Sequence, residues 1–115
     1  MEEQTIFDRL LKKEIPADII YEDDYVVSFR DINPQAPIHV LVIPKQKARN
    51  ITELAEQDPV TAGHYLKGIG KTAKQLNLPK NGYRVVFNTG KDGQQTVEYV
   101  HAHILGGRQM DWPPG

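Results

Sequence analysis

The chain has 115 residues, with 14 lysines and arginines against 15 aspartates and glutamates, and it contains no cysteine. This length suits one compact domain, which we expect to cover residues 1–115. The net charge of −1 offers no basic surface for duplex nucleic acid or an anionic membrane, so we expect neither partner. The lack of cysteine excludes disulfides and thiolate metal sites. Together with an acidic N-terminus and no long apolar run, it favours a cytoplasmic protein.

The first half of the chain predicts a short helix and three strands. Thr5 and Asp8 have the spacing of a capping box, and the helix that they open is expected to reach Lys13. Its buried face is predicted to consist of Ile6, Leu10 and Leu11. Strands are predicted over residues 19–22, 25–31 and 39–45. A stiff loop with two prolines, residues 33–37, separates the last two strands of this antiparallel meander.

The second half predicts one long helix and two further strands. The helix begins at Asp58 and Pro59 and ends before Pro79. Its apolar residues recur at helical spacing at Ala62, Leu66, Ile69, Ala73 and Leu76. His64 in this helix is expected to face solvent or to be structural. Strands over 83–88 and 96–105 flank a polar loop, so the order predicts an α+β domain with one long and one short helix against an antiparallel sheet.

The last predicted strand carries two histidines on one face. Strand alternation places His101 and His103 with Val97, Tyr99 and Leu105. The opposite face, formed by Val100, Ala102 and Ile104, is apolar and suits a core. Adjacent imidazoles are costly to bury for stability alone, so we interpret the histidine face as a functional site. A pair of hydrogen-bonded structural histidines explains the same short motif, and the motif alone leaves both interpretations open.

A glycine-containing loop, residues 90–96, leads directly into the histidine strand. Exposed amides and the Thr96 hydroxyl in such a loop are suited to hold a phosphate. The same composition also makes an ordinary hairpin connection. The position of the loop next to the histidines favours phosphorus chemistry.

Several long segments resemble one family. The run VHAHILGGRQM at 100–110 and the terminal WPPG are similar to the C-terminus of the histidine triad (HIT) superfamily, within it the Hint branch. Similar segments at 6–24, 29–45 and 82–96 extend the resemblance over nearly the whole chain. The resemblance implies a homodimer with joined sheets. It also implies a cofactor-independent hydrolase that binds purine nucleotides of the AMP or GMP type and cleaves nucleoside phosphoramidates and aminoacyl adenylates.

The resemblance also implies roles for catalytic residues. His101 matches the nucleophile, which forms a nucleotidyl-histidine intermediate and is oriented by the backbone carbonyl of Tyr99. His103 matches the histidine that hydrogen-bonds the phosphate oxygens as they gain charge. His39 matches a further histidine near the cluster, and Thr96 is suited to help protonate the leaving amine.

Nucleotide-binding positions carry over in the same way. Asp31 matches the residue that accepts hydrogen bonds from both ribose hydroxyls, and Ile32 lies beside it. The apolar base slot is matched by Ile6, Phe7, Leu10, Phe29 and Leu41. For these five apolar residues, ordinary core packing is the stronger interpretation. Besides Thr96, the positions around the phosphate are matched by Asn88, Gln94, Gln95 and Val97. Trp112 in the tail is implied to pack near the active site across the dimer.

The chain departs from the family pattern at four positions. Tyr99 stands where the first histidine of the triad is usual, and it cannot carry a proton near neutral pH. We therefore expect reduced turnover. Gln94 replaces a glycine, Thr96 a serine and Asp111 a histidine, and the bulk of Gln94 is expected to affect phosphate affinity.

Other functions remain open from sequence. The incomplete triad is compatible with a purine-nucleotide-binding or interaction module with little turnover, which covalent labelling of His101 would distinguish. A zinc site formed by His39, His101 and His103 is a further possibility, although no acidic partner is evident and we predict no metal. A dinucleoside polyphosphate hydrolase from another branch is disfavoured by the segments 106–110 and 112–115.

Overall fold

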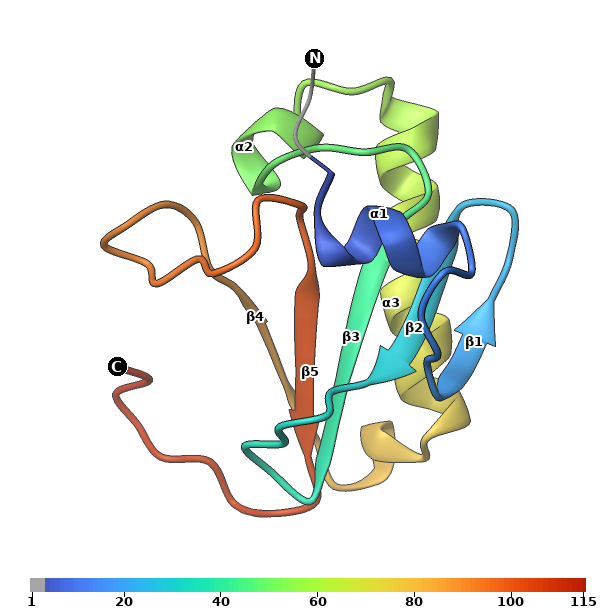
Figure 1. Cartoon of the computed structure of the whole chain (residues 1–115). Helices are drawn as coiled ribbons and strands as arrows, with labels where there is room; N and C mark the ends of the chain where they lie inside the picture. Colours follow the sequence, from blue (N-terminus) through green and yellow to red (C-terminus); the bar gives the residue numbers. More distant parts are fainter. Residues whose placement is uncertain (1–3) are drawn as a thin grey trace.

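An antiparallel sheet with the strand order β1-β2-β3-β5-β4 forms the centre of the computed structural model, which describes residues 4–115 (Figure 1). The strands are β1 Ile19–Glu22, β2 Val26–Arg30, β3 Ile38–Pro44, β4 Arg84–Phe87 and β5 Ala102–Gly106. The α+β class and the meander of β1, β2 and β3 are confirmed, and β5 lies between β3 and β4. The acidic residues Glu2 and Glu3 of the predicted N-terminal segment lie outside the described residues.

Helices cover both faces of the sheet (Figure 1). The helical elements are α1 Ile6–Leu11, α2 Ile51–Leu54, α3 Pro59–Gln75 and the 3₁₀ turn Leu78–Lys80. The predicted capping box is present, since the Thr5 hydroxyl accepts from the Asp8 amide at 3.2 Å and the Asp8 carboxylate accepts from the Thr5 amide at 2.7 Å. The helix α1 stops before Lys13, which has a φ of 61°. The short helix α2 was not predicted from the sequence.

One face of the sheet packs against α3. Tyr65, Ile69, Thr72 and Ala73 are buried there, at spacings that form a single helix face. The helical spacing placed Leu66 with the apolar residues of this helix, but its side chain falls outside the buried face and is 69% exposed. The two polar members of the face are satisfied. The Tyr65 hydroxyl donates to the Val42 carbonyl at 2.8 Å, and the Thr72 hydroxyl donates to a helix carbonyl.

The other face of the sheet packs against α1 and is the face on which the candidate site lies. Its core contains Phe7, Leu10, Val27, Phe29, Leu41, Ile43 and Tyr99. Ile6 was predicted to be buried but is 50% exposed, because the six-residue helix turns Phe7 and Leu10 toward the sheet instead. Within residues 4–115, no helix is long and apolar enough to cross a membrane.

The last strand is shorter than predicted. Ladder pairing with β3 runs from Gly106 to Ala102, whereas residues 96–101 lie outside the strand. The chain diverges there because the amide of Val100 donates to the carbonyl of Ala48, in the loop after β3, at 2.8 Å. The predicted alternation of side chains between the two faces of the sheet is confirmed for residues 99, 100, 102 and 104. Val100, Ala102 and Ile104 join the core on the α3 side, while Tyr99 belongs to the core on the α1 side.

Candidate active site

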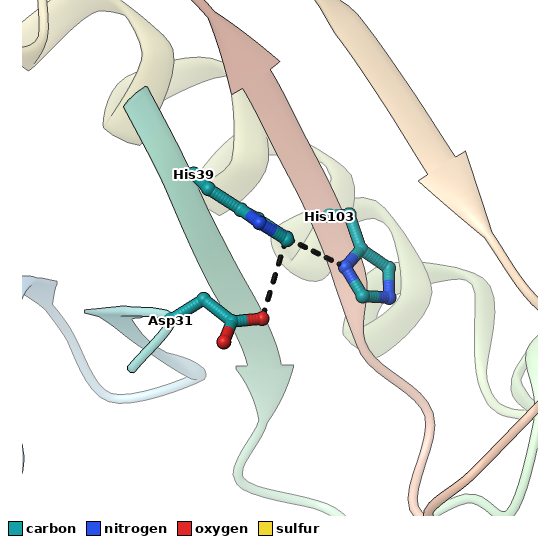
Figure 2. Close-up of side chains that lie close together, drawn as sticks. All are labelled: Asp31, His39 and His103. Carbon is teal, nitrogen blue, oxygen red and sulfur yellow. Dashed lines mark hydrogen bonds and ion pairs between the residues drawn. The ribbon is translucent and has the colours of Figure 1, made fainter. Parts of the chain in front are cut away.

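Histidines from neighbouring strands meet on the α1 side of the sheet. In the ladder between β3 and β5, His39 pairs with Leu105 and His103 pairs with Leu41, so the two histidines are diagonal neighbours on one face. Asp31 directly follows β2, and its amide donates to the His39 carbonyl at 3.0 Å. Figure 2 shows the side chains of Asp31, His39 and His103 converging.

Hydrogen bonds fix the tautomers of His39 and His103. The backbone amide of Gln35 donates to Nδ1 of His39 at 3.0 Å, so the proton of a neutral His39 ring is on Nε2. That Nε2 lies 2.9 Å from Nδ1 of His103 (Figure 2). Nδ1 of His103 therefore accepts, and its Nε2 carries the proton. The stiff loop 33–37 thus orients the histidine pair through Gln35.

Burial keeps both rings neutral. Desolvation lowers the pKa of His39, although the nearby Asp31 carboxylate acts in the opposite direction. Desolvation, reinforced by His101 and His39, lowers the pKa of His103 to about 4. At neutral pH His103 therefore presents a neutral N–H donor at Nε2.

His101 has the geometry of a nucleophile. Its Nδ1 lies 2.7 Å from the carbonyl oxygen of Tyr99 and donates to it, which leaves the lone pair on Nε2. The ring is 7% exposed and contacts the ring of Phe7 edge-on, with centroids 5.0 Å apart. Burial lowers the pKa of His101, although the Tyr99 carbonyl and Asp31 oppose the effect. The imidazole is therefore neutral and able to attack an electrophile near pH 7.

A cavity of about 490 Å³ lies between α1, the end of β2 and the histidines. Eleven of the residues predicted for the site line it: Ile6, Phe7, Leu10, Phe29, Asp31, Ile32, Leu41, Thr96, Val97, His101 and His103. Sequence reasoning missed the rest of the wall, which is formed by Ile15, Pro16, Ala17, Asp18 and Arg30. The cavity is apolar on one side and polar at the histidines, as a site for a ligand with a flat ring and an anionic group would be.

The cluster of Asp31, His39 and His103 offers three possible ligand atoms within 4.8 Å of one another. His101, which the predicted zinc set included, is not part of this cluster, and Asp31 is the acidic partner that was not evident from sequence. The cluster does not fit a metal ion as it stands. The Gln35 amide occupies Nδ1 of His39, so Nε2 carries the ring proton and has no lone pair for a metal.

The comparisons with known proteins agree with this geometry. A family profile described as the HIT domain matches residues 12–110. The chain belongs to the HIT domain family. Its maize relative, the 14 kDa zinc-binding protein of Zea mays, is 54% identical over 114 residues, which cover 96% of this chain and 88% of the relative.

Solved HIT structures superpose closely. The crystal structure of a HIT family hydrolase from Legionella pneumophila Philadelphia 1 has a TM-score of 0.90 and 42% identity, covering 97% of this chain and 100% of that one. The crystal structure of a histidine triad nucleotide-binding protein from Candida albicans has a TM-score of 0.81 and 31% identity, covering 96% of this chain and 83% of that one. The HIT fold therefore supports a nucleotide hydrolase or nucleotide-binding role for this chain.

Three positions expected at the phosphate in this HIT protein organise the preceding loop and do not line the cavity. The Asn88 amide donates to the Gly93 carbonyl at 2.7 Å. The Gln95 side chain accepts from the Gly90 amide at 3.0 Å and donates to the Val97 carbonyl at 2.9 Å. Gln94 is exposed and has a φ of 58°, in the left-handed region that favours glycine.

The groups of this loop that do reach the cavity belong to Thr96 and Val97. Within residues 4–115, their amides and the Thr96 hydroxyl make no hydrogen bond to another group. They are therefore donors available to a ligand. A phosphate beside His101 and His103 would meet these groups as well as the two imidazoles.

Trp112 and His64 do not line the cavity. Trp112 is 82% exposed on the C-terminal tail, which leads away from the sheet in Figure 1. The guanidinium of Arg84 holds the tail by donating to the Asp111 carbonyl at 2.7 Å. His64 stacks on Tyr25, with ring centroids 3.8 Å apart and planes 5° apart. The stacking gives His64 a structural contact, consistent with its predicted role.

Proposed function

We propose that this HIT protein, as a member of the Hint branch, hydrolyses the P–N bond of purine nucleoside 5′-phosphoramidates, and also cleaves aminoacyl adenylates. The observation that supports this most strongly is that an imidazole nitrogen with a free lone pair neighbours an imidazole N–H donor. Nδ1 of His101 is engaged by the Tyr99 carbonyl, and the neighbouring His103 carries its proton on Nε2. Both residues line the same cavity.

The proposed reaction has two displacements at phosphorus. Nε2 of His101 attacks the α-phosphorus, forming a P–N bond to histidine as the P–N bond to the amine breaks. The departing amine takes one proton from solvent through the Thr96 hydroxyl. Water then attacks the phosphorus, the bond to His101 breaks, and the proton from that water returns to solvent. The products are the nucleoside monophosphate and the amine.

In this proposal, each part of the nucleotide binds a different part of the cavity wall. The purine ring lies among apolar residues of α1 and β2, such as Phe7 and Phe29. The ribose hydroxyls donate to the Asp31 carboxylate at the rim. The phosphate accepts hydrogen bonds from Nε2–H of His103 and from the amides of Thr96 and Val97. These hydrogen bonds strengthen as negative charge shifts to the phosphate oxygens.

We propose that the protein acts as a homodimer and in the cytoplasm. The edge strand β4 has no partner on its outer side within the described chain, and Val85 on it is 39% exposed. Leu66 on α3 is likewise an exposed apolar side chain. In a dimer, Trp112 would approach the active site of the other copy. Sedimentation tests the assembly, and a monomer at micromolar concentration would overturn it.

The experiment that tests the function measures amine release from tryptamine adenosine phosphoramidate. The parent is expected to turn over and to gain mass as a nucleotidyl adduct, whereas His101→Ala loses both. His64→Ala is the matched control, since it removes a histidine outside the cavity and is expected to keep activity. Binding of adenosine monophosphate with no turnover and no adduct in the parent would favour the nucleotide-binding module instead.

We propose that the reaction needs no metal. The maize relative is named for zinc binding, but in this chain a metal on His39 would have to displace the proton that the Gln35 hydrogen bond fixes on Nε2. Dialysis against a chelator is expected to leave the rate unchanged, with metal content checked by mass spectrometry. Loss of activity that added zinc restores would contradict the proposal.

A further inference from the structure

A single proton on His39 faces two acceptors. Nε2 of His39 lies 2.9 Å from Nδ1 of His103 and 3.4 Å from Oδ2 of Asp31 (Figure 2). Since Nδ1 of His39 already accepts from Gln35, the neutral ring has no second proton to offer. Nδ1 of His103 takes the hydrogen bond, and the Asp31 carboxylate lies beside the same N–H and competes for it.

The position of Asp31 is fixed by the backbone. Its Oδ1 accepts from the amide of Asn33 at 2.8 Å, which turns Oδ2 toward His39. The His39 side chain is 4% exposed and that of Asp31 is 19% exposed, and Asp31 lines the cavity whereas His39 does not. A charged acceptor in such a place attracts the proton strongly even at 3.4 Å.

The two acceptors have different consequences for His103. When the His39 proton points to Nδ1 of His103, the His103 ring keeps its own proton on Nε2. When the Asp31 carboxylate also attracts this N–H, the hydrogen bond to Nδ1 of His103 is weaker, and the His103 tautomer with the proton on Nδ1 becomes more populated. That tautomer presents a lone pair, not a donor, to a phosphate oxygen.

We propose that Asp31 is a positioning residue for His103: a ligand diol that donates to the Asp31 carboxylate frees the His39 proton for His103 alone and so locks the His103 donor onto the phosphate. This inference rests on the proposed function, in which the diol is the ribose of the nucleotide. It makes the ribose hydroxyls contribute to the rate of the phosphorus chemistry in addition to binding. The effect reaches the reacting phosphate through Asp31, His39 and His103 in series.

The test separates rate from affinity. Tryptamine phosphoramidates of adenosine and of 2′,3′-dideoxyadenosine are compared by the single-turnover rate constant for adduct formation at saturation. In the parent the dideoxy substrate is expected to react about fivefold more slowly, roughly the value of one hydrogen bond. In Asp31→Ala and Asp31→Asn the two substrates are expected to react at similar rates, because the competing charge is gone.

The matched control is Asp18→Ala, which removes a carboxylate that lines the same cavity and is paired with Arg30 at 3.3 Å. It is expected to preserve the rate ratio between the two substrates. Equal saturated rate constants for the two substrates in the parent, with a difference in affinity alone, would overturn the proposal. A ratio that persists in both Asp31 variants would overturn it as well.

A spectroscopic measurement tests the inference even if no substrate turns over. The ¹⁵N shifts of the His103 ring report its tautomer, and they are recorded with adenosine monophosphate and with its 2′,3′-dideoxy analogue at saturation. The Nε2–H tautomer is expected to be more fully populated with adenosine monophosphate. The same His103 spectrum in both complexes would contradict the proposal, whereas absent turnover with a spectral difference would contradict only the proposed hydrolysis.

Discussion

The side-chain hydroxyl of Tyr99 donates to the backbone carbonyl of Pro44 at the end of β3. The same residue accepts the Nδ1 proton of His101 with its own carbonyl. Burial raises the pKa of the Tyr99 hydroxyl, so it stays protonated near neutral pH. Tyr99 thus anchors the backbone on which His101 depends, and its hydroxyl is bonded to Pro44 and not to an imidazole.

Tyr99→Phe is expected to affect stability more than catalysis. It removes one buried hydrogen bond and leaves the Pro44 carbonyl without that donor, which costs about 1–2 kcal/mol of unfolding free energy. The carbonyl that orients His101 remains, so the rate constant for adduct formation should change by less than about twofold. Urea unfolding and single-turnover kinetics measure the two effects. A large loss of rate at unchanged stability would show that the hydroxyl takes part in the reaction.

His39→Ala is expected to slow adduct formation about tenfold, equivalent to about 1.4 kcal/mol, because Nδ1 of His103 loses the donor that fixes its tautomer. His39→Gln retains an amide N–H and should recover part of that loss. Thermal unfolding of both variants controls for damage to the fold. If Ala and Gln behave alike while both stay folded, the hydrogen bond to His103 is not what His39 contributes.

Stability is expected to fall on the acid side of neutrality. Burial, followed by the neighbouring histidines, lowers the pKa of His103 from 6.5 to about 4 in the folded state. Between these values the unfolded chain binds more protons than the native protein, so stability is full above about pH 6.5 and is lost as the pH falls toward 4. Urea unfolding at pH 7 and pH 5 measures the difference. His103→Ala should flatten the dependence, whereas His64→Ala should leave it unchanged.

The loop of residues 90–96 offers two substitutions with opposite expected effects. Gln94→Gly removes the backbone strain of a non-glycine residue in the left-handed region and is expected to stabilise the protein by about 0.5–1 kcal/mol. The greater freedom of glycine in the unfolded chain offsets part of this gain. Gly93→Ala would place a Cβ 2.5 Å from the Thr89 carbonyl oxygen and should destabilise the loop. Melting temperatures test both. Stabilisation by Gly93→Ala would contradict this loop geometry.

Local pattern in the sequence was enough to predict the elements. The alternation and turn residues placed every predicted strand except the last within one residue at each end, and the capping box at Thr5 placed the start of α1. The family resemblance predicted eleven residues of the cavity wall, from Ile6 near the N-terminus to His103. These features depend on neighbours in sequence or on motifs that are themselves local.

Tertiary structure decided which partner each polar group has. The Asn88 and Gln95 side chains hold their own loop, and Asp31 faces His39 as well as the cavity, which residue type alone does not reveal. Leu66 matched the helical period yet lies outside the packed face, because the sheet selects one of several apolar stripes. The sequence determined which residues could form the site. The packing of α1, β3 and β5 determined where each proton in it resides, since a proton on an imidazole depends on the atom across from it.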